Sequence, residues 1–161
     1  MLFRSTGVTL PSDYQFVAGD LGTHTFVGGV AVQKVGLRTI TATSIGAAVK
    51  GTANVTVVAG ALSKFLVSGF PLTTVHNVAH SFTVIAQDAY GNTITNYLGT
   101  VQFTNAGGTA LLPAPYTFTS KDKGKHVFNA TFQTMGAGQS LTVADQNDPS
   151  ITGSETGINV T

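Results

Sequence analysis

The chain has 161 residues, a formal net charge of +1 and only 9% charged residues, so it lacks the basic surface with which proteins bind nucleic acid. It has no cysteine, which excludes thiol catalysis, disulfide bonds and thiolate metal sites. Its hydrophobic content of 42% is enough to build a core, and its 19 glycines are typical of short strands joined by tight turns. This composition favours an all-β protein.

The N-terminal residues Met1–Ser5 lack the apolar stretch of a signal peptide. No run in the chain approaches the length of a membrane-spanning helix, so we expect no membrane span. These two observations predict either a cytoplasmic protein or a piece of a longer exported chain whose signal lies elsewhere.

Alternation of apolar and polar residues with a period of two predicts strands through most of the second part of the chain. The alternating runs lie, in order, at 81–87, 100–104, 116–119, 128–133, 140–143 and 158–161. Turn phrases such as Ser68–Pro71 and Tyr90–Asn92 separate strands from one another. About seven strands in roughly 100 residues match an immunoglobulin-like antiparallel β-sandwich.

An internal repeat with an offset of about 102 residues is the strongest feature of the sequence. Four phrases recur in the same order, each as a pair: Leu10–Phe16 with Leu112–Phe118, Asp20–Phe26 with Asp122–Phe128, Thr39–Ala42 with Ser140–Val143, and Val55–Val57 with Ile158–Val160. This period is too long for a solenoid and predicts a tandem series of whole domains.

Residues 61–110 have no counterpart earlier in the chain. We therefore predict a partial immunoglobulin-like repeat over residues 1–60, which holds only the later strands, and a complete sandwich over residues 61–161. Half a sandwich cannot bury its inner face alone. The first part must recruit strands from another chain, pack on the second part, or come from a truncated gene. We expect truncation, with self-association as its physical consequence.

Two motifs carry a resemblance to a known family. The phrase Asp88–Asn92 follows one strand and precedes the next, and residues 122–128 have the pattern Asp-x-Gly-x-His-x-Phe ahead of Gly136 and a Thr-rich strand. Together they resemble the tandem bacterial immunoglobulin-like repeats of large surface and secreted proteins, similar to invasin and filamin-type sandwiches. The resemblance covers the second repeat from end to end and the first from about residue 8.

This resemblance implies a non-catalytic module of a bacterial extracellular or cell-surface protein, serving as a spacer, in adhesion or in ligand contact. The partners it implies are other copies of the repeat or of the chain itself, through strand swapping in a homo-oligomer, and a carbohydrate or cell-surface ligand. Tyr90 and Tyr97 lie near loops and are the candidates for sugar contact. No cofactor is firmly implied.

Histidines offer the first candidate chemistry. His24 and His126 occupy equivalent repeat positions, four residues after Asp20 and Asp122. An Asp–His pair could act as a general base or bind a metal. We favour a structural role, because a residue that recurs with the domain usually serves the domain, and the glycine between Asp and His marks a turn that the Asp would cap.

His76 and His80 are not repeated and lie four residues apart. On a helix this spacing would converge on a metal. On a strand the two side chains stand about 13 Å apart, so a shared metal needs a bend in the backbone. We expect two solvated loop histidines.

Oxygen-rich loops are the better candidates for a metal. Asp88 and Asn92 flank a tight turn, and Asp145, Asn147 and Asp148 lie in one loop. Carboxylate, amide and backbone oxygens suit Ca²⁺, although the spacing does not match an EF-hand. Asx side chains in turns more often form local hydrogen bonds.

The alternative function is a small metal-dependent hydrolase that acts on an ester or a lactone. Zn²⁺ or Ca²⁺ would polarise the carbonyl and activate a water molecule. His76, His80 and Asp88 are the catalytic candidates, with Asp145 and Asp148 as further ligands. This hypothesis requires these side chains to converge within a few ångströms.

Overall fold

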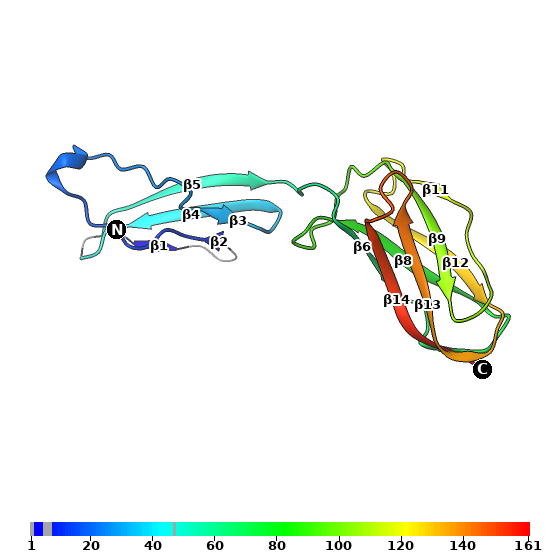
Figure 1. Cartoon of the computed structure of the whole chain (residues 1–161). Helices are drawn as coiled ribbons and strands as arrows, with labels where there is room; N and C mark the ends of the chain where they lie inside the picture. Colours follow the sequence, from blue (N-terminus) through cyan, green and yellow to red (C-terminus); the bar gives the residue numbers. More distant parts are fainter. Residues whose placement is uncertain (1, 5–7, 47) are drawn as a thin grey trace. The chain divides into compact units, whose positions relative to one another are not determined.

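The computed structural model describes residues 2–4, 8–46 and 48–161, and the chain divides into two units, Met1–Val58 (unit 1) and Ala59–Thr161 (unit 2). Strands and loops make up both units (Figure 1). Within the described residues the one helical element is a single 3-10 turn, η1 (Ala18–Asp20). That part of the chain contains no helix long and apolar enough to cross a membrane. The all-β fold class predicted from the sequence is confirmed.

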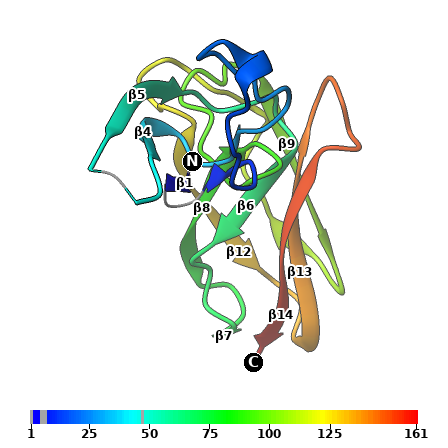
Figure 2. The same cartoon turned by 90° about the vertical axis from the view of Figure 1, so that its left-hand side faces the viewer.

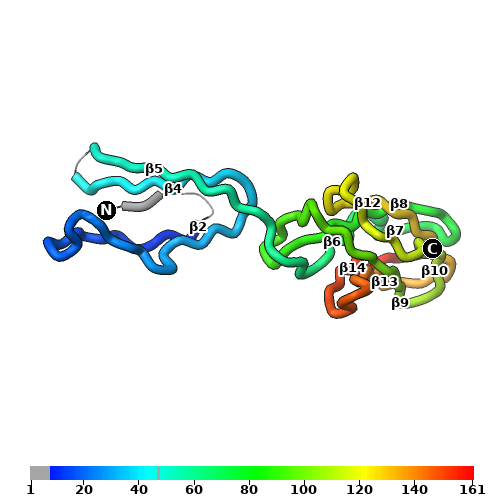
Figure 3. Tube along the Cα trace, turned by 90° about the horizontal axis from the view of Figure 1, so that it is seen from above, coloured from blue at the N-terminus to red at the C-terminus, as the bar shows by residue number. Residues whose placement is uncertain are grey.

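Unit 2 is a sandwich of two sheets (Figures 2 and 3). One sheet has the strand order β10-β12-β8-β6, and the other has the order β11-β9-β13-β14-β7, in which only β7 runs parallel to its neighbour. The strands are β6 (Lys64–Ser68), β7 (Thr73–Thr74), β8 (Ala79–Gln87), β9 (Thr100–Ala106), β10 (Ala110–Leu111), β11 (Tyr116–Thr117), β12 (Lys125–Phe132), β13 (Gly136–Asp145) and β14 (Thr152–Val160).

The core of unit 2 lies between the two sheets and follows the period-two pattern. On β8, Phe82, Val84 and Ala86 are at most 1% exposed. The ring of Phe82 packs against those of Phe128 on β12 and Phe103 on β9, at centroid distances of 5.7 and 5.9 Å. Full burial of each such side chain contributes about 1.5–3 kcal/mol. The apolar face that the sequence pattern predicts is therefore what holds the two sheets together.

The two sheets approach each other closely at Gly153. This residue lies on β14, opposite Val143 of β13, and a Cβ atom at this position would collide with the backbone carbonyl oxygen of Phe65 on β6. Glycine inside a strand often marks such a close approach of another backbone. Contact between β6 and β14 thus depends on the absence of a side chain at residue 153.

Unit 1 repeats part of this topology. Its strands are β1 (Leu2–Arg4), β2 (Val8–Thr9), β3 (Ala31–Val32), β4 (Gly36–Thr43) and β5 (Lys50–Val57). The sheet β1-β4-β5 corresponds to β9-β13-β14, and the pair β2-β3 corresponds to β10-β12. The registers agree, because Phe3 lies opposite Ala42 as Phe103 lies opposite Val143. Unit 1 thus has strands ordered like β9, β10, β12, β13 and β14 of unit 2, and its being a partial repeat of the domain stays a prediction.

The described part of unit 1 has no counterpart of β6, β7 or β8. Its larger sheet ends at β5, where unit 2 continues to β7, and its smaller one ends at β3, where unit 2 continues to β8 and β6. No side chain among residues 8–46 and 48–58 is buried. Phe16 is 39% exposed, whereas its counterpart Phe118 is 2% exposed. The inner face of unit 1 is therefore open in these residues.

A matched pair of substitutions tests the close approach at Gly153. We expect Gly153→Ala to lower the free energy of unfolding of unit 2 by about 2 kcal/mol or more, because the new methyl group overpacks against the β6 backbone. Its counterpart Gly51 lies on β5, opposite Ala42 of β4. Among the described residues, no atom beyond its chain neighbours lies within 4 Å of the position that a Cβ would take there, so Gly51→Ala should change stability by less than about 1 kcal/mol. Urea unfolding of both variants measures the difference, and equal effects would contradict it.

Candidate functional site

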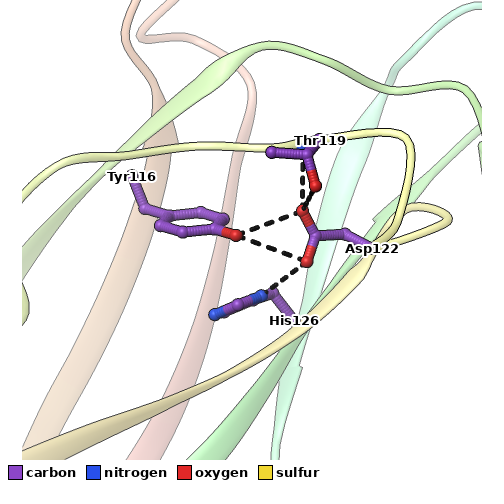
Figure 4. Close-up of polar contacts among 4 residues, drawn as sticks. All are labelled: Tyr116, Thr119, Asp122 and His126. Atoms are coloured by element: carbon purple, nitrogen blue, oxygen red, sulfur yellow. Dashed lines mark hydrogen bonds and ion pairs between the residues drawn. The ribbon is translucent and has the colours of Figure 1, made fainter.

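Four side chains of unit 2, those of Tyr116, Thr119, Asp122 and His126, form a hydrogen-bonded corner, named here the Asp122 corner (Figure 4). Tyr116 belongs to β11, and His126 lies at the start of β12. The turn between them is closed by the Asp122 N–H, which donates to the Thr119 carbonyl at 3.1 Å. Positive φ angles at Lys123 and Gly124 reverse the chain, and glycine adopts such an angle without strain.

The Asp122 carboxylate accepts hydrogen bonds from every other member of the corner. The Thr119 N–H and hydroxyl donate to Oδ2 at 2.7 and 2.8 Å, and the Tyr116 hydroxyl donates at 3.1 Å. His126 Nδ1 lies 2.7 Å from Oδ1. Burial alone would raise the pKa of Asp122, but these hydrogen bonds outweigh it and hold the pKa well below its usual range. The carboxylate is therefore ionised, and both of its oxygens accept hydrogen bonds.

Two aromatic rings pack against the His126 ring. The ring stacks on Tyr116 with a centroid distance of 4.1 Å and lies 4.7 Å from the ring of Phe128. Burial, followed by the hydrogen bond to Asp122, raises the pKa of Tyr116. The hydroxyl thus remains a proton donor to the carboxylate. The imidazole is held between a carboxylate and two aromatic rings.

Unit 1 contains the same arrangement around Asp20, named here the Asp20 corner. The Tyr14 hydroxyl donates to Asp20 at 3.1 Å, and the Val17 N–H donates at 2.8 Å. His24 Nδ1 lies 3.4 Å from Asp20 Oδ1, and the His24 ring stacks on Tyr14 at 3.7 Å. A valine stands where unit 2 has Thr119, so the hydroxyl donor is the one member without a counterpart.

These contacts indicate what the corner can do chemically. An Asp–His pair can serve as a general base only when a nucleophile or a water molecule stands on the far side of the imidazole. The two hydroxyls that contact this pair, those of Tyr116 and Thr119, both donate to the Asp122 carboxylate and not to the histidine. Through the Tyr116 hydroxyl the pair links β11 to the start of β12, and the structural role expected from the sequence stays a prediction.

Sequence reasoning found the Asp and His of this corner but missed the tyrosine. Its signal was present, because Tyr14 and Tyr116 each lie six residues before their Asp within the repeated phrases. Period-two alternation assigned Tyr116 to the core face, where burial alone explains an aromatic residue. The hydrogen bond to Asp122 became visible only from the turn that brings residues 116 and 122 together.

Asp88 and Asn92 do lie together, in the turn after β8. Asp88 Oδ1 accepts the N–H groups of Tyr90 and Asn92 at 2.9 and 2.8 Å, and Oδ2 accepts the Asn92 amide at 2.8 Å. Oδ2 also accepts the Gly60 N–H at 3.1 Å. Burial raises the pKa of Asp88, but these donors lower it to about 2. A cation here would have to displace N–H groups from both oxygens.

The loop after β13 is closed in the same way. Asp145 Oδ1 accepts the N–H groups of Asn147 and Asp148 at 2.8 and 3.0 Å, and Oδ2 accepts the Tyr97 hydroxyl at 2.6 Å. Asp148 accepts the Ser150 hydroxyl at 2.6 Å. Burial, followed by the bond to Asp145, raises the pKa of Tyr97. Calcium binding by these loops stays a prediction.

The expectation of two solvated loop histidines is wrong for His80, which lies on β8 and is half-buried, whereas His76 is exposed in a loop. Each of the two has its own partner. His80 Nε2 lies 2.7 Å from the Thr74 hydroxyl, and its ring packs near Phe70. His76 Nδ1 lies 3.2 Å from the Thr161 carbonyl oxygen. Among the described residues no three His, Asp or Glu side chains gather as a metal site would require. The hydrolase hypothesis groups both histidines with Asp88. In the described residues neither histidine forms a hydrogen bond with Asp88.

Among the comparisons with known proteins, only the comparison with solved structures found matches. No family model and no curated protein matches the chain. A glycosyl hydrolase family 2 member from Bacteroides cellulosilyticus matches at a TM-score of 0.54 and 16% identity, over 83% of this chain and 18% of that one. A β-glycosidase from Bacteroides vulgatus matches at 0.53 and 12%, over 80% and 18%. The Escherichia coli adhesin FdeC matches at 0.48 and 23%, over 81% and 42%.

The two glycosidase likenesses show the fold, an immunoglobulin-like β-sandwich, and nothing about activity at these identities. The chain spans less than a fifth of the length of either glycosidase. The fold predicted from the sequence is confirmed.

Substitution of the carboxylate tests the structural role of the Asp122 corner. We expect Asp122→Asn to lower the melting temperature of unit 2 by about 5–10 °C, because an amide turns one acceptor oxygen into a donor facing the Thr119 N–H. Asp13→Asn, at an exposed position, is the matched control and should leave the temperature unchanged. Thermal unfolding followed by circular dichroism measures both. Equal melting temperatures for the two variants would contradict the role.

Acid should weaken unit 2 through the same carboxylates. Asp88 and Asp122 have folded-state pKa values below the unfolded value of about 3.9, so their contribution is complete above that pH and is lost as pH falls toward the folded values. We expect the melting temperature to decline between roughly pH 5 and pH 2. The decline should be shallower in Asp88→Asn, which starts from a lower melting temperature at pH 7. An unchanged slope in that variant would contradict the assignment.

Proposed function

We propose that the chain is a non-catalytic, immunoglobulin-like repeat module of a bacterial extracellular or cell-surface protein, and that it acts as a load-bearing spacer. The observation that carries this proposal is the recurrence of one structural corner in both units. Tyr, Asp and His meet at 116, 122 and 126 as they do at 14, 20 and 24. An active site would need only one copy, whereas a corner that closes each domain must recur with the domain.

The matched share of the glycosidases supports the same role. A fold that accounts for 18% of those chains is used there as one part of a larger protein. A repeat offset of about 102 residues equals roughly the length of one such domain. A series of whole domains is therefore the arrangement that we propose for the parent protein.

Strand order gives unit 2 a means of resisting force. β7 lies near the start of the unit and pairs in parallel with β14 at its end. The Asn159 N–H donates to the Leu72 carbonyl and the Thr161 N–H donates to the Thr74 carbonyl, both at 2.8 Å. The His76 N–H donates to the Thr161 carbonyl at 2.8 Å. Pulling the two ends of the unit apart shears these parallel strands, so the hydrogen bonds share the load.

Ligand contact by the module would depend on exposed aromatic side chains. Tyr90 is 56% exposed, whereas Tyr97 is 8% exposed and bonded to Asp145. The turn at Tyr90 is therefore the place that we propose for contact with a carbohydrate. Neighbouring copies of the repeat are the partners that the spacer role itself requires.

Single-molecule force spectroscopy tests the spacer role, and the natural absence of cysteine permits site-specific attachment. Attachment through Ala61→Cys and Thr161→Cys shears β7 against β14, whereas attachment through Val75→Cys and Thr161→Cys peels them apart from one end. We expect a clearly higher unfolding force in the first geometry, because several hydrogen bonds must break together. Equal forces in the two geometries would refute a load-bearing role.

A further inference from the structure

One segment distinguishes the closed unit from the open one. Residues 61–99, named here the leading segment, contain β6, β7, β8 and Tyr97. In unit 2 this segment supplies the partner strand of β12 and the edge partner of β14. The chain holds one leading segment and two sets of later strands. If two copies of the chain exchanged their leading segments, each copy would still have one leading segment for two sets of later strands. One set of later strands would therefore stay uncovered.

Unit 1 contains a hollow of about 600 Å³ whose lining residues have counterparts beside Tyr97 in unit 2. It is lined by residues that include Phe16 and Ser44. Their counterparts in unit 2 are Phe118, whose ring lies 5.1 Å from that of Tyr97, and Asp145, which accepts the Tyr97 hydroxyl. The hollow thus has an aromatic wall and a polar end, as a tyrosine side chain requires.

Gly51 is a second, independent sign of the same occupant. It lies within β5, its φ angle is not in the left-handed region, and no atom of the described residues beyond its chain neighbours lies within 4 Å of a Cβ built on it. Glycine there weakens a strand without any benefit to unit 1 as it stands. Its counterpart Gly153 admits the backbone of Phe65 from β6. Gly51 leaves the same space for a strand like β6.

We propose that unit 1 is an acceptor for a further polypeptide segment with the chemistry of residues 61–99: strands that extend both open sheets, and a tyrosine that fills the hollow beside Phe16. The strand equivalent to β6 would cross Gly51, and the one equivalent to β8 would pair along residues 24–32. Burial of Phe16 and Val55, which are 39% and 40% exposed, would drive docking. This inference rests on the geometry of the two units and not on the spacer role.

The test adds a synthetic peptide of residues 61–99, labelled with fluorescein, to the full chain and measures binding by anisotropy and amide hydrogen exchange by mass spectrometry. We expect saturable binding and exchange slowed by roughly tenfold or more at residues 24–32 and 50–57, with unit 2 unchanged. Tyr97→Ala in the peptide should weaken binding by about tenfold or more, because it empties the hollow. Tyr90→Ala in the peptide is the matched control and should bind normally, since that side chain is exposed in unit 2.

A substitution in the acceptor probes the same contact from the other side. Gly51→Ala in the full chain should weaken peptide binding by about tenfold or more, because the methyl group occupies the path of the β6-like strand. If the free peptide aggregates, residues 61–101 joined directly to Leu2 supply the same strands, and the same protection is expected. Absence of protection in that linked chain overturns the proposal. So does protection of residues 50–57 in the chain alone that grows with its concentration, because a second copy would then cover the edge.

Discussion

Burial of two apolar sheet faces against each other is the interaction on which this structure depends. In unit 2 the inner faces of β8, β12, β13 and β14 enclose a core of phenylalanine, leucine and valine side chains that water does not reach. Each strand contributes only every second residue, so neither sheet can bury its face without the other. Strands β6 and β8 of the leading segment make the sheet β10-β12-β8-β6 wide enough to cover the facing sheet. The described part of unit 1 has no counterpart of β6 or β8, and there a residue such as Phe16 stays exposed while its counterpart Phe118 is buried.

The carboxylates serve this sandwich at its ends, where backbone N–H groups are left without partners in the sheets. Asp88, Asp122 and Asp145 each accept hydrogen bonds from backbone N–H groups of a turn. A cation at any of these carboxylates would have to displace N–H donors that already occupy the oxygens. The same arrangement of tyrosine, aspartate and histidine is present in both units, which supports the structural role proposed for it.

Much of this architecture could be predicted from residue patterns. The alternation in Phe82–Ala86 identified a strand and its buried face, and the recurrence of Asp20–Phe26 at 122–128 identified equivalent corners. The partners of those corners could not be predicted, because Tyr116 lies six residues from Asp122 and only the turn through Gly124 closes that distance. Tyr97 shows the same limit, since a tyrosine near a loop could equally face solvent, and its bond to Asp145 spans 48 residues.

Local patterns thus determine which segments become strands, which face of each strand is apolar and where the chain turns, because these properties depend on neighbours within a few residues. Tertiary structure decides which carboxylates meet which donors, and whether a glycine such as Gly51 or Gly153 stands in open space or against another backbone. Those outcomes depend on contacts between residues far apart in the chain. Two nearly identical glycine positions therefore have different surroundings, because only one of them has the crossing strand.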